Sequence, residues 1–309
     1  MIEVEHLTKK YGDLIAVNDL NFTIEKGKIW GLLGPNAAGK TTTMRILTGF
    51  LPATNGKARV AGFDVFENPE DVKKIMGYLP ENVPLYPEMT VREYLHFVAE
   101  IKQVPSSQRT SAVEKAIEVS SLQSVWKRLI KNISRGYRQR VGIAQALIHD
   151  PEVLILDEPT IGLDPAQIRE IRELIKSLKK SHTIILSTHI LAEVTQTCDG
   201  VIIINEGRLM RSGSLNELTA SFSKGKDGVL LKLRQTGSGV QSLLKNIPGV
   251  KNISLQDDGI KIEWSTGQDL RDRLVHLIAE KNLGLMEMRP LAMNIEDLYL
   301  RAVSGGVQQ

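Results

Sequence analysis

One stretch near the start of the sequence has the residue types and spacing needed to bind a chain of phosphates. Positions 34 to 41 read GPNAAGKT and fit the pattern G-x-x-x-x-G-K-[ST], between an apolar run and a helical pattern. In such a loop, successive backbone N–H groups point into one concavity and bind phosphate oxygens, and the positive end of the following helix adds to their effect. Lys40 would reach the β- and γ-phosphates of a nucleotide, and the Thr41 hydroxyl would bind Mg²⁺. The residues predicted to contact the nucleotide here are Gly34, Pro35, Asn36, Ala37, Ala38, Gly39, Lys40, Thr41 and Thr42.

Two adjacent carboxylates follow a short apolar run later in the chain. The segment VLILDEPT places Asp157 and Glu158 directly after four apolar residues that predict a buried strand. Open α/β sheets bind their ligands at the carboxyl ends of such strands. Asp157 suits Mg²⁺, directly or through water, and Glu158 is placed to orient or deprotonate an attacking water. An ordinary strand end could also carry two acids, but the phosphate loop favours the metal and base roles.

Further landmarks stand before, between and after these two segments, in the expected order along the chain. With them, roughly residues 1–220 resemble the ATP-binding subunits of ABC transporters, most closely those of ABC-2 type exporters, including the gliding-motility group. The landmarks are Tyr11, where the family has an aromatic that stacks on adenine; YLPE at 78–81, the Q-loop; ISRGY at 133–137, the signature; RQR at 138–140; GLD at 162–164, the D-loop; and His189, the switch histidine.

The resemblance implies ATP and Mg²⁺ as cofactors and gives each matching residue a role. Catalysis would depend on Glu158, His189 and Lys40, with the histidine donating a hydrogen bond to the γ-phosphate. The implied Mg²⁺ ligands are Thr41, Glu81 and Asp157. Tyr11 would stack on the base, although a strand-end aromatic is the simpler interpretation of that residue alone.

The signature departs from the family pattern at its first, third and fifth positions, where Leu, Gly and Gln are usual. Ser134 and Gly136 remain. The resemblance implies that these two bind the γ-phosphate of ATP held by an opposing copy. A serine before a helix is also a common N-cap, so that interpretation stays open.

Two other positions differ from the usual family residues. Glu81 stands where most relatives have Gln, and a carboxylate can still bind Mg²⁺ there. Ala37 stands where Gly is usual. If that position requires a positive φ, alanine costs roughly 1–2 kcal/mol, so we expect a working site of lower affinity.

The resemblance implies an ATPase that converts ATP and water to ADP and phosphate and drives export. Two copies would close head to tail over two ATP molecules, and separate multi-span membrane permease subunits would form the path. The chain would be cytoplasmic and peripheral on the inner face of the cell membrane. The alternative is a soluble ABC ATPase acting on ribosomes or DNA. Such proteins generally carry two ATPase units or long coiled-coil or zinc insertions, and this sequence has neither.

Composition excludes several classes of protein. The 309 residues carry 39 Lys plus Arg against 36 Asp plus Glu, a net charge of +3 that gives no argument for nucleic acid as a partner. The single cysteine, Cys198, excludes an internal disulfide and a multi-cysteine zinc site. No apolar run approaches the roughly 18 residues of a membrane helix.

These residues need elements that position them. Apolar runs at 29–33, 153–156 and 183–188 predict buried parallel strands, and a helical pattern over 40–47 follows the phosphate loop. The predicted fold is an α/β P-loop NTPase of ABC type over residues 1–220, with an antiparallel β subdomain and a helical subdomain at about 84–146. A linker is predicted at 221–228.

Residues 229–309 are predicted to form an accessory α+β domain. Their pattern reads βαββαβ, the ferredoxin-like order. RNA-recognition domains share this order and stack bases on strand aromatics. The strand at 229–234 has no aromatic and the strand at 260–264 has only Trp264, so a regulatory or dimer-stabilising role is favoured.

Overall fold

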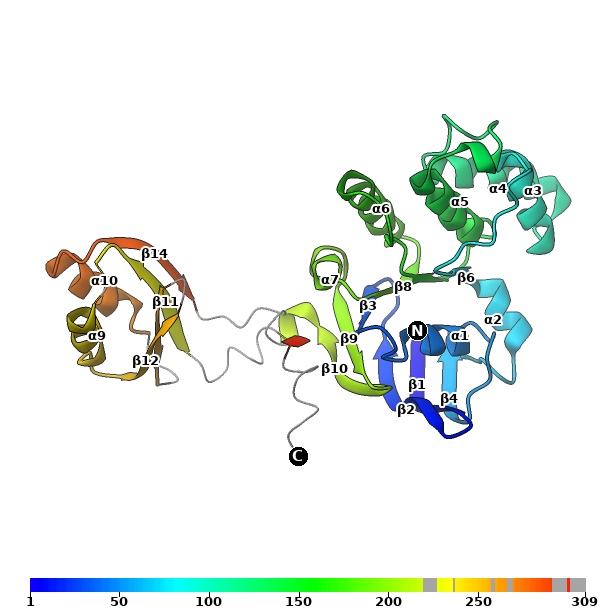
Figure 1. Ribbon diagram of the computed structural model, residues 1–309. Helices are drawn as coiled ribbons and strands as arrows, with labels where there is room; N and C mark the ends of the chain where they lie inside the picture. Colours follow the sequence, from blue (N-terminus) through cyan, green and yellow to red (C-terminus); the bar gives the residue numbers. More distant parts are fainter. Residues whose placement is uncertain (219–226, 236, 257–258, 266–268, 291–298, 301–309) are drawn as a thin grey trace. The chain divides into compact units, whose positions relative to one another are not determined.

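The computed structural model describes residues 1–218, 227–235, 237–256, 259–265, 269–290 and 299–300 (Figure 1). The chain divides into two compact units, Met1–Leu215 and Asn216–Leu300. Residues 221–226 of the predicted linker lie outside the described residues. Residues 227 and 228, at the end of the predicted linker, instead open strand β11 (Asp227–Leu233), where they pair with Trp264 and Glu263 of the neighbouring strand.

The first unit begins with an antiparallel sheet of strand order β2-β1-β4-β5. Its strands alternate buried and exposed residues, as the sequence pattern predicts; Ile2 and Val4 of the first strand are buried and their neighbours Glu3 and Glu5 are exposed. The strands are β1 (Ile2–Tyr11), β2 (Leu14–Ile24), β4 (Asn55–Val60) and β5 (Phe63–Asp64).

A second sheet of strand order β10-β9-β3-β8-β7-β6 forms the centre of this unit. Five neighbouring strands are parallel and β10 is antiparallel to β9. The strands are β3 (Ile29–Leu33), β6 (Met76–Leu79), β7 (Val153–Asp157), β8 (Thr183–Thr188), β9 (Gly200–Asn205) and β10 (Arg208–Ser214).

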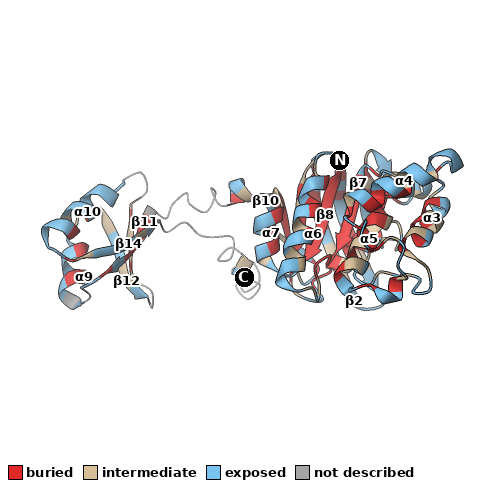
Figure 2. Ribbon diagram, turned by 90° about the horizontal axis from the view of Figure 1, so that it is seen from above, coloured by how far each residue is buried: buried red, intermediate tan, exposed pale blue. Residues whose placement is uncertain are grey.

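Both faces of the central sheet are covered, which explains why its strands read as continuous apolar runs. Val153 and Ile155 of β7 join the core shared with the antiparallel sheet and α1 (Lys40–Leu47), whereas Leu154 and Leu156 pack with α6 (Pro165–Leu178). Figure 1 shows β1, β2 and β4 on one side of β8, and α6 and α7 (Leu191–Thr197) on the other. Figure 2 shows the buried residues concentrated in these central strands.

The remaining helices of the first unit complete its surface. The predicted helical block has a core of its own, formed by α3 (Val91–Ile101), α4 (Ser106–Val119) and α5 (Arg135–Leu147). A 3₁₀ turn, Ile130–Asn132, precedes α5, and helix α2 (Pro69–Ile75) leads into β6. In the part of the chain that the structure describes, no helix has both the length and the apolar character needed to cross a membrane.

The second unit has the element order βαββαβ and an antiparallel sheet of order β12-β13-β11-β14. The ferredoxin-like assignment stays a prediction, which this order supports. Trp264 is only 5% exposed and lies in the core, so it offers no surface for a base. Besides β11, the elements are α9 (Ser238–Lys245), β12 (Val250–Gln256), β13 (Gly259–Trp264), α10 (Arg271–Glu280) and β14 (Leu285–Pro290).

The packing of β7 gives a stability prediction. Leu154 is fully buried between the sheet and α6, so Leu154→Ala should lower the free energy of unfolding of the first unit by about 2–5 kcal/mol. Leu14 is 66% exposed, and Leu14→Ala should change it by no more than about 0.5 kcal/mol. Urea denaturation of both variants measures the difference, and equal midpoints would contradict this account of the core.

Candidate functional site

The phosphate loop lies between β3 and α1, as predicted. Helix α1 begins at Lys40, and its N-cap residue, Gly39, has no side chain that could accept from the first turn. The early N–H groups of a helix have no partner within the helix, so these are free to bind an anion. Both flanking glycines are required by close contacts. A Cβ on Gly34 would lie 2.3 Å from the Ile204 carbonyl oxygen, and one on Gly39, at φ 100°, would lie 2.6 Å from that of Ala16.

Ala37 has the left-handed conformation in which alanine is strained, so the condition for lower affinity predicted from the sequence is met. Its φ is 64°, a region that glycine enters freely and alanine enters at a cost of roughly 1–2 kcal/mol. The turn is closed by the Ala38 N–H, which donates to the Pro35 carbonyl at 3.2 Å. The departure from the family pattern therefore falls on a strained residue.

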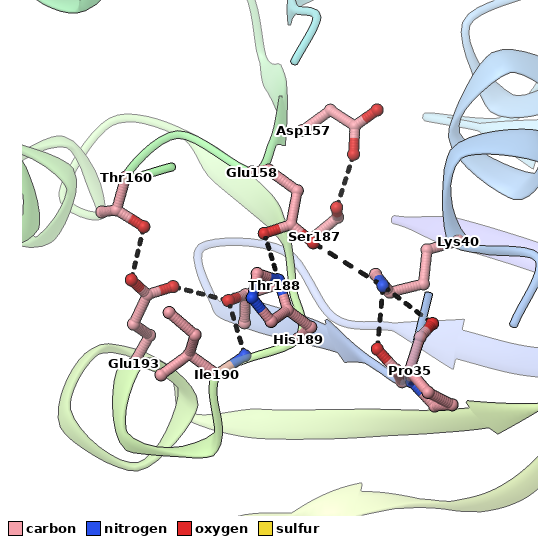
Figure 3. A network of polar contacts seen from close by, with 11 residues as sticks. Pro35, Lys40, Asp157, Glu158, Thr160, Ser187, Thr188, His189, Ile190 and Glu193 are labelled. Carbon is pink, nitrogen blue, oxygen red and sulfur yellow. Dashed lines mark hydrogen bonds and ion pairs between the residues drawn. The ribbon is translucent and has the colours of Figure 1, made fainter. Parts of the chain in front are cut away.

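The Lys40 side chain is buried and its ammonium contacts both the loop and a carboxylate. Nζ donates to the carbonyl oxygens of Gly34 at 2.8 Å and Pro35 at 3.1 Å. It also lies 3.6 Å from Oε1 of Glu158 (Figure 3). Thus residues 118 positions apart in sequence meet at the mouth of the loop.

Asp157 ends β7 and is 1% exposed. Ser187 Oγ of β8 donates to its Oδ1 at 2.5 Å, while Oδ2 is buried without a hydrogen-bond partner among the described residues. Buried polar atoms are normally paired. An unpaired carboxylate oxygen suits a hard cation that takes oxygen ligands, so the site fits the predicted Mg²⁺.

Glu158 contacts both Lys40 at the phosphate loop and His189 in the switch segment, that is, the residues that directly follow β8. It is 7% exposed, its φ is 47°, and its Oε2 lies 3.0 Å from Nδ1 of His189, which follows β8. The structure therefore brings together the three residues predicted to be catalytic: Lys40, Glu158 and His189.

The predicted metal ligand Glu81 follows β6, which pairs in parallel with β7. It is exposed near the edge of the sheet at which Asp157 lies. Tyr78, in the same segment, is partly buried, and burial, together with the negative charge of Asp157, raises the pKa of its phenol to about 12. Tyr78 therefore stays protonated beside the carboxylates and can donate a hydrogen bond.

Tyr11 is 46% exposed at the end of β1, with Lys9 Nζ 5.2 Å from its ring centroid. It pairs with Leu14 across the β1–β2 hairpin. The same hairpin brings the Ala16 carbonyl against Gly39 of the phosphate loop. Tyr11 thus belongs to the hairpin beside the loop.

The signature residues are not part of this cluster. Ser134 is the N-cap of α5 and its Oγ accepts from the Tyr137 N–H at 3.3 Å, so the N-cap interpretation is confirmed. Gly136 is buried against Gln167 of α6. Ser134 and Gly136 thus contact Tyr137 and Gln167 at the start of α5, and the contacts described for them include neither Lys40 nor Glu158.

Sequence reasoning missed a set of buried polar residues next to the catalytic ones. Thr160 and Thr188 both donate to Glu193 of α7, and Ser187 donates to Asp157. A weak signal was present, because Ser187 and Thr188 directly precede His189 in an otherwise apolar strand.

Comparisons with known proteins agree with this geometry. The sequence model of the ABC transporter family matches residues 17–161, and that of an AAA domain matches residues 129–195. The bacitracin transport ATP-binding protein BcrA of Bacillus licheniformis is 34% identical over 99% of this chain and 98% of its own length. The linearmycin resistance ATP-binding protein LnrL of Bacillus subtilis is 29% identical over 97% of each.

A solved structure of an ATP-binding subunit of an ABC transporter is 29% identical and superimposes with a TM-score of 0.65, covering 72% of this chain and 93% of that one. Two observations lead to the same assignment. Relatives align along nearly the whole chain, and the phosphate loop, the carboxylates and His189 lie in one cluster. The chain belongs to the ABC transporter family of ATP-binding, ATP-hydrolysing proteins.

Proposed function

We propose that this chain is the ATPase subunit of an exporter and that Lys40, Asp157, Glu158 and His189 form its catalytic centre. The observation that carries this proposal is the convergence of Lys40 and His189 on one buried carboxylate, beside the unpaired oxygen of Asp157. The full-length relatives with transport and resistance names support export. Membership of the gliding-motility group stays a prediction.

Nucleotide binding would use groups that the loop already presents. The first-turn N–H groups of α1 would bind phosphate oxygens, and Lys40 would exchange the Gly34 and Pro35 carbonyls for the β- and γ-phosphates. Thr41, Asp157 and Glu81 would hold Mg²⁺, which neutralises charge on the phosphates. Tyr11 would stack on the adenine from the neighbouring hairpin.

Hydrolysis would depend on Glu158 and His189. Once Lys40 turns to the phosphates, the Glu158 carboxylate keeps His189 as its partner and can orient or deprotonate a water. His189 would donate to the γ-phosphate oxygens as negative charge develops there. Because Glu158 is nearly buried, its interactions are weakly screened by solvent.

The signature residues would act across a dimer. Ser134 and Gly136 lie apart from the catalytic cluster of their own chain, which supports a head-to-tail arrangement with a second copy. Each copy would then supply Ser134 to the ATP of the other. The pair would bind at the cytoplasmic face of the membrane, and separate multi-span permease subunits would convert its closure and reopening into export.

Glu158→Gln tests the catalytic role. The amide keeps the shape of the side chain but cannot take a proton, so turnover should fall at least about a hundredfold while the dissociation constant for ATP stays within about threefold. Phosphate release and nucleotide titration measure the two quantities. Glu173→Gln, at an exposed ion pair with Lys176, should behave as wild type. Hydrolysis at the wild-type rate by Glu158→Gln would remove Glu158 from this role.

A mixing experiment tests the head-to-tail dimer. Lys40→Ala and Ser134→Ala should each be inactive as homodimers, because every site lacks one group. A mixed dimer has one intact site, so an equal mixture should recover up to about a quarter of wild-type activity if sites act independently. Activity no higher than that of either variant alone would count against sites shared between copies.

Ala37→Gly tests the strained loop. Glycine adopts φ 64° without steric cost, and this gain should outweigh the conformational entropy that glycine adds to the unfolded chain. The free energy of unfolding in urea should therefore rise by about 1 kcal/mol. Nucleotide titration then shows whether the strain also lowers affinity, as the sequence led us to expect. Equal dissociation constants would disprove that expectation, and equal stability would disprove the strain.

A further inference from the structure

Glu193 is a buried carboxylate that the proposed chemistry does not use. It lies on α7, is 3% exposed, and has no ion-pair partner among the described residues. Its Oε2 accepts from Thr188 Oγ1 at 2.6 Å and its Oε1 accepts from Thr160 Oγ1 (Figure 3). A buried charge is tolerated only when its oxygens are paired, so Glu193 depends on both hydroxyls.

These contacts are part of a closed ring of residues that includes the catalytic carboxylate, Glu158. Thr160 lies two residues after Glu158, and Thr188 directly precedes His189. The ring is completed where Glu158 Oε2 meets His189 Nδ1 at 3.0 Å. Glu193 therefore links the segment that follows Glu158 to the segment that carries the switch histidine.

The ring holds two backbone segments that need support. Glu158 has φ 47°, and strained residues of this kind persist only where their surroundings fix them. Its N–H donates to the Ser187 carbonyl at 3.1 Å and its carbonyl accepts from the Ile161 N–H at 3.2 Å. On the other side, Thr188 Oγ1 accepts from the Ile190 N–H at 3.0 Å, so the same hydroxyl that binds Glu193 also shapes the turn containing His189.

We propose that Glu193 is a positioning residue for ATP hydrolysis. It holds the backbone segment that carries Glu158 and the segment that carries His189 in a fixed position relative to each other. Glu193 touches neither nucleotide nor water in this account and acts only through Thr160 and Thr188. The inference rests on the proposed catalytic roles of Glu158 and His189. A small displacement of either group would act on the transition state more than on bound ATP.

The test measures steady-state hydrolysis, ATP affinity and melting temperature of the full chain with Glu193→Ala, Glu193→Gln and Thr160→Val. Glu193→Ala should lower kcat at least about tenfold and leave KM and the dissociation constant for ATP within about threefold. Glu193→Gln keeps the shape and one carbonyl acceptor, so it should retain more of kcat than Glu193→Ala. Glu173→Gln serves as the control for loss of a carboxylate.

The double variant Thr160→Val/Glu193→Ala separates positioning from independent effects. If both residues act through one ring, the double variant should lose no more of kcat than Glu193→Ala alone. Losses that multiply would overturn the proposal. So would wild-type kcat in correctly folded Glu193→Ala, even with a lowered melting temperature, because a purely structural residue affects the amount of folded protein and not its turnover.

If Glu193→Ala does not fold, Thr160→Val and Thr188→Val test the proposal in its place, since each removes one hydroxyl of the ring. Reduced kcat with unchanged KM in both supports the proposal, and wild-type kcat in both overturns it.

Glu158→Gln separates this inference from the proposed function. Full activity of Glu158→Gln contradicts the catalytic centre itself, whereas inactive Glu158→Gln beside fully active Glu193→Ala contradicts only the role of Glu193.

Discussion

The end of β7 places two carboxylates, Asp157 and Glu158, where water is almost excluded, and the surrounding site is arranged so that their charge is tolerated. Burying a charge is costly unless a partner and hydrogen bonds compensate for it. Lys40 and His189 approach Glu158, and Ser187 donates to Asp157. Among the described residues, no group donates to the second oxygen of Asp157, which leaves the site suited to a cation and a polyanion together. Lys40 at the phosphate loop, Ser187 of β8 and His189 after β8 supply these partners.

The sheet supplies the rigidity that the arrangement needs. Because β3, β7 and β8 are adjacent and parallel, their carboxyl ends bring the phosphate loop, the two acids and the switch histidine to one edge. Packing on both faces fixes these strands, whereas the loops that follow them carry the strained residues Ala37 and Glu158. Strain is thus confined to the positions where the chain turns toward the ligand.

Much of this site could be predicted from the sequence because its signals are local. The apolar runs at 29–33 and 183–188 correspond to β3 and β8, and the motif at 34–41 marks the loop between β3 and α1. The positive φ of Ala37 could be stated only as a condition, since the sequence does not reveal backbone conformation. The end of the linker was misjudged because Gly228 is a poor strand former by itself but pairs with Glu263.

The ring through Glu193 could not be predicted, because it depends on contacts between distant segments. Thr160 and Glu193 are 33 residues apart, and each alone is an ordinary polar residue near a helix or strand. Which buried hydroxyls face the carboxylate is decided by how α7 packs on the sheet. The Lys40–Glu158 contact is of the same kind: both residues were assigned to the site, but their pairing required the structure.

The Asp157 carboxylate and the phosphate loop should form one Mg²⁺–nucleotide site. Isothermal titration of Mg·ATP into the wild-type chain and into Asp157→Asn tests it most directly, with ATP in a metal chelator as the reference. We predict that Asp157→Asn weakens binding of Mg·ATP at least about tenfold and leaves binding of metal-free ATP unchanged, because a ligand of the cation is lost and the loop is not. Equal affinity of the two proteins for Mg·ATP would contradict the account.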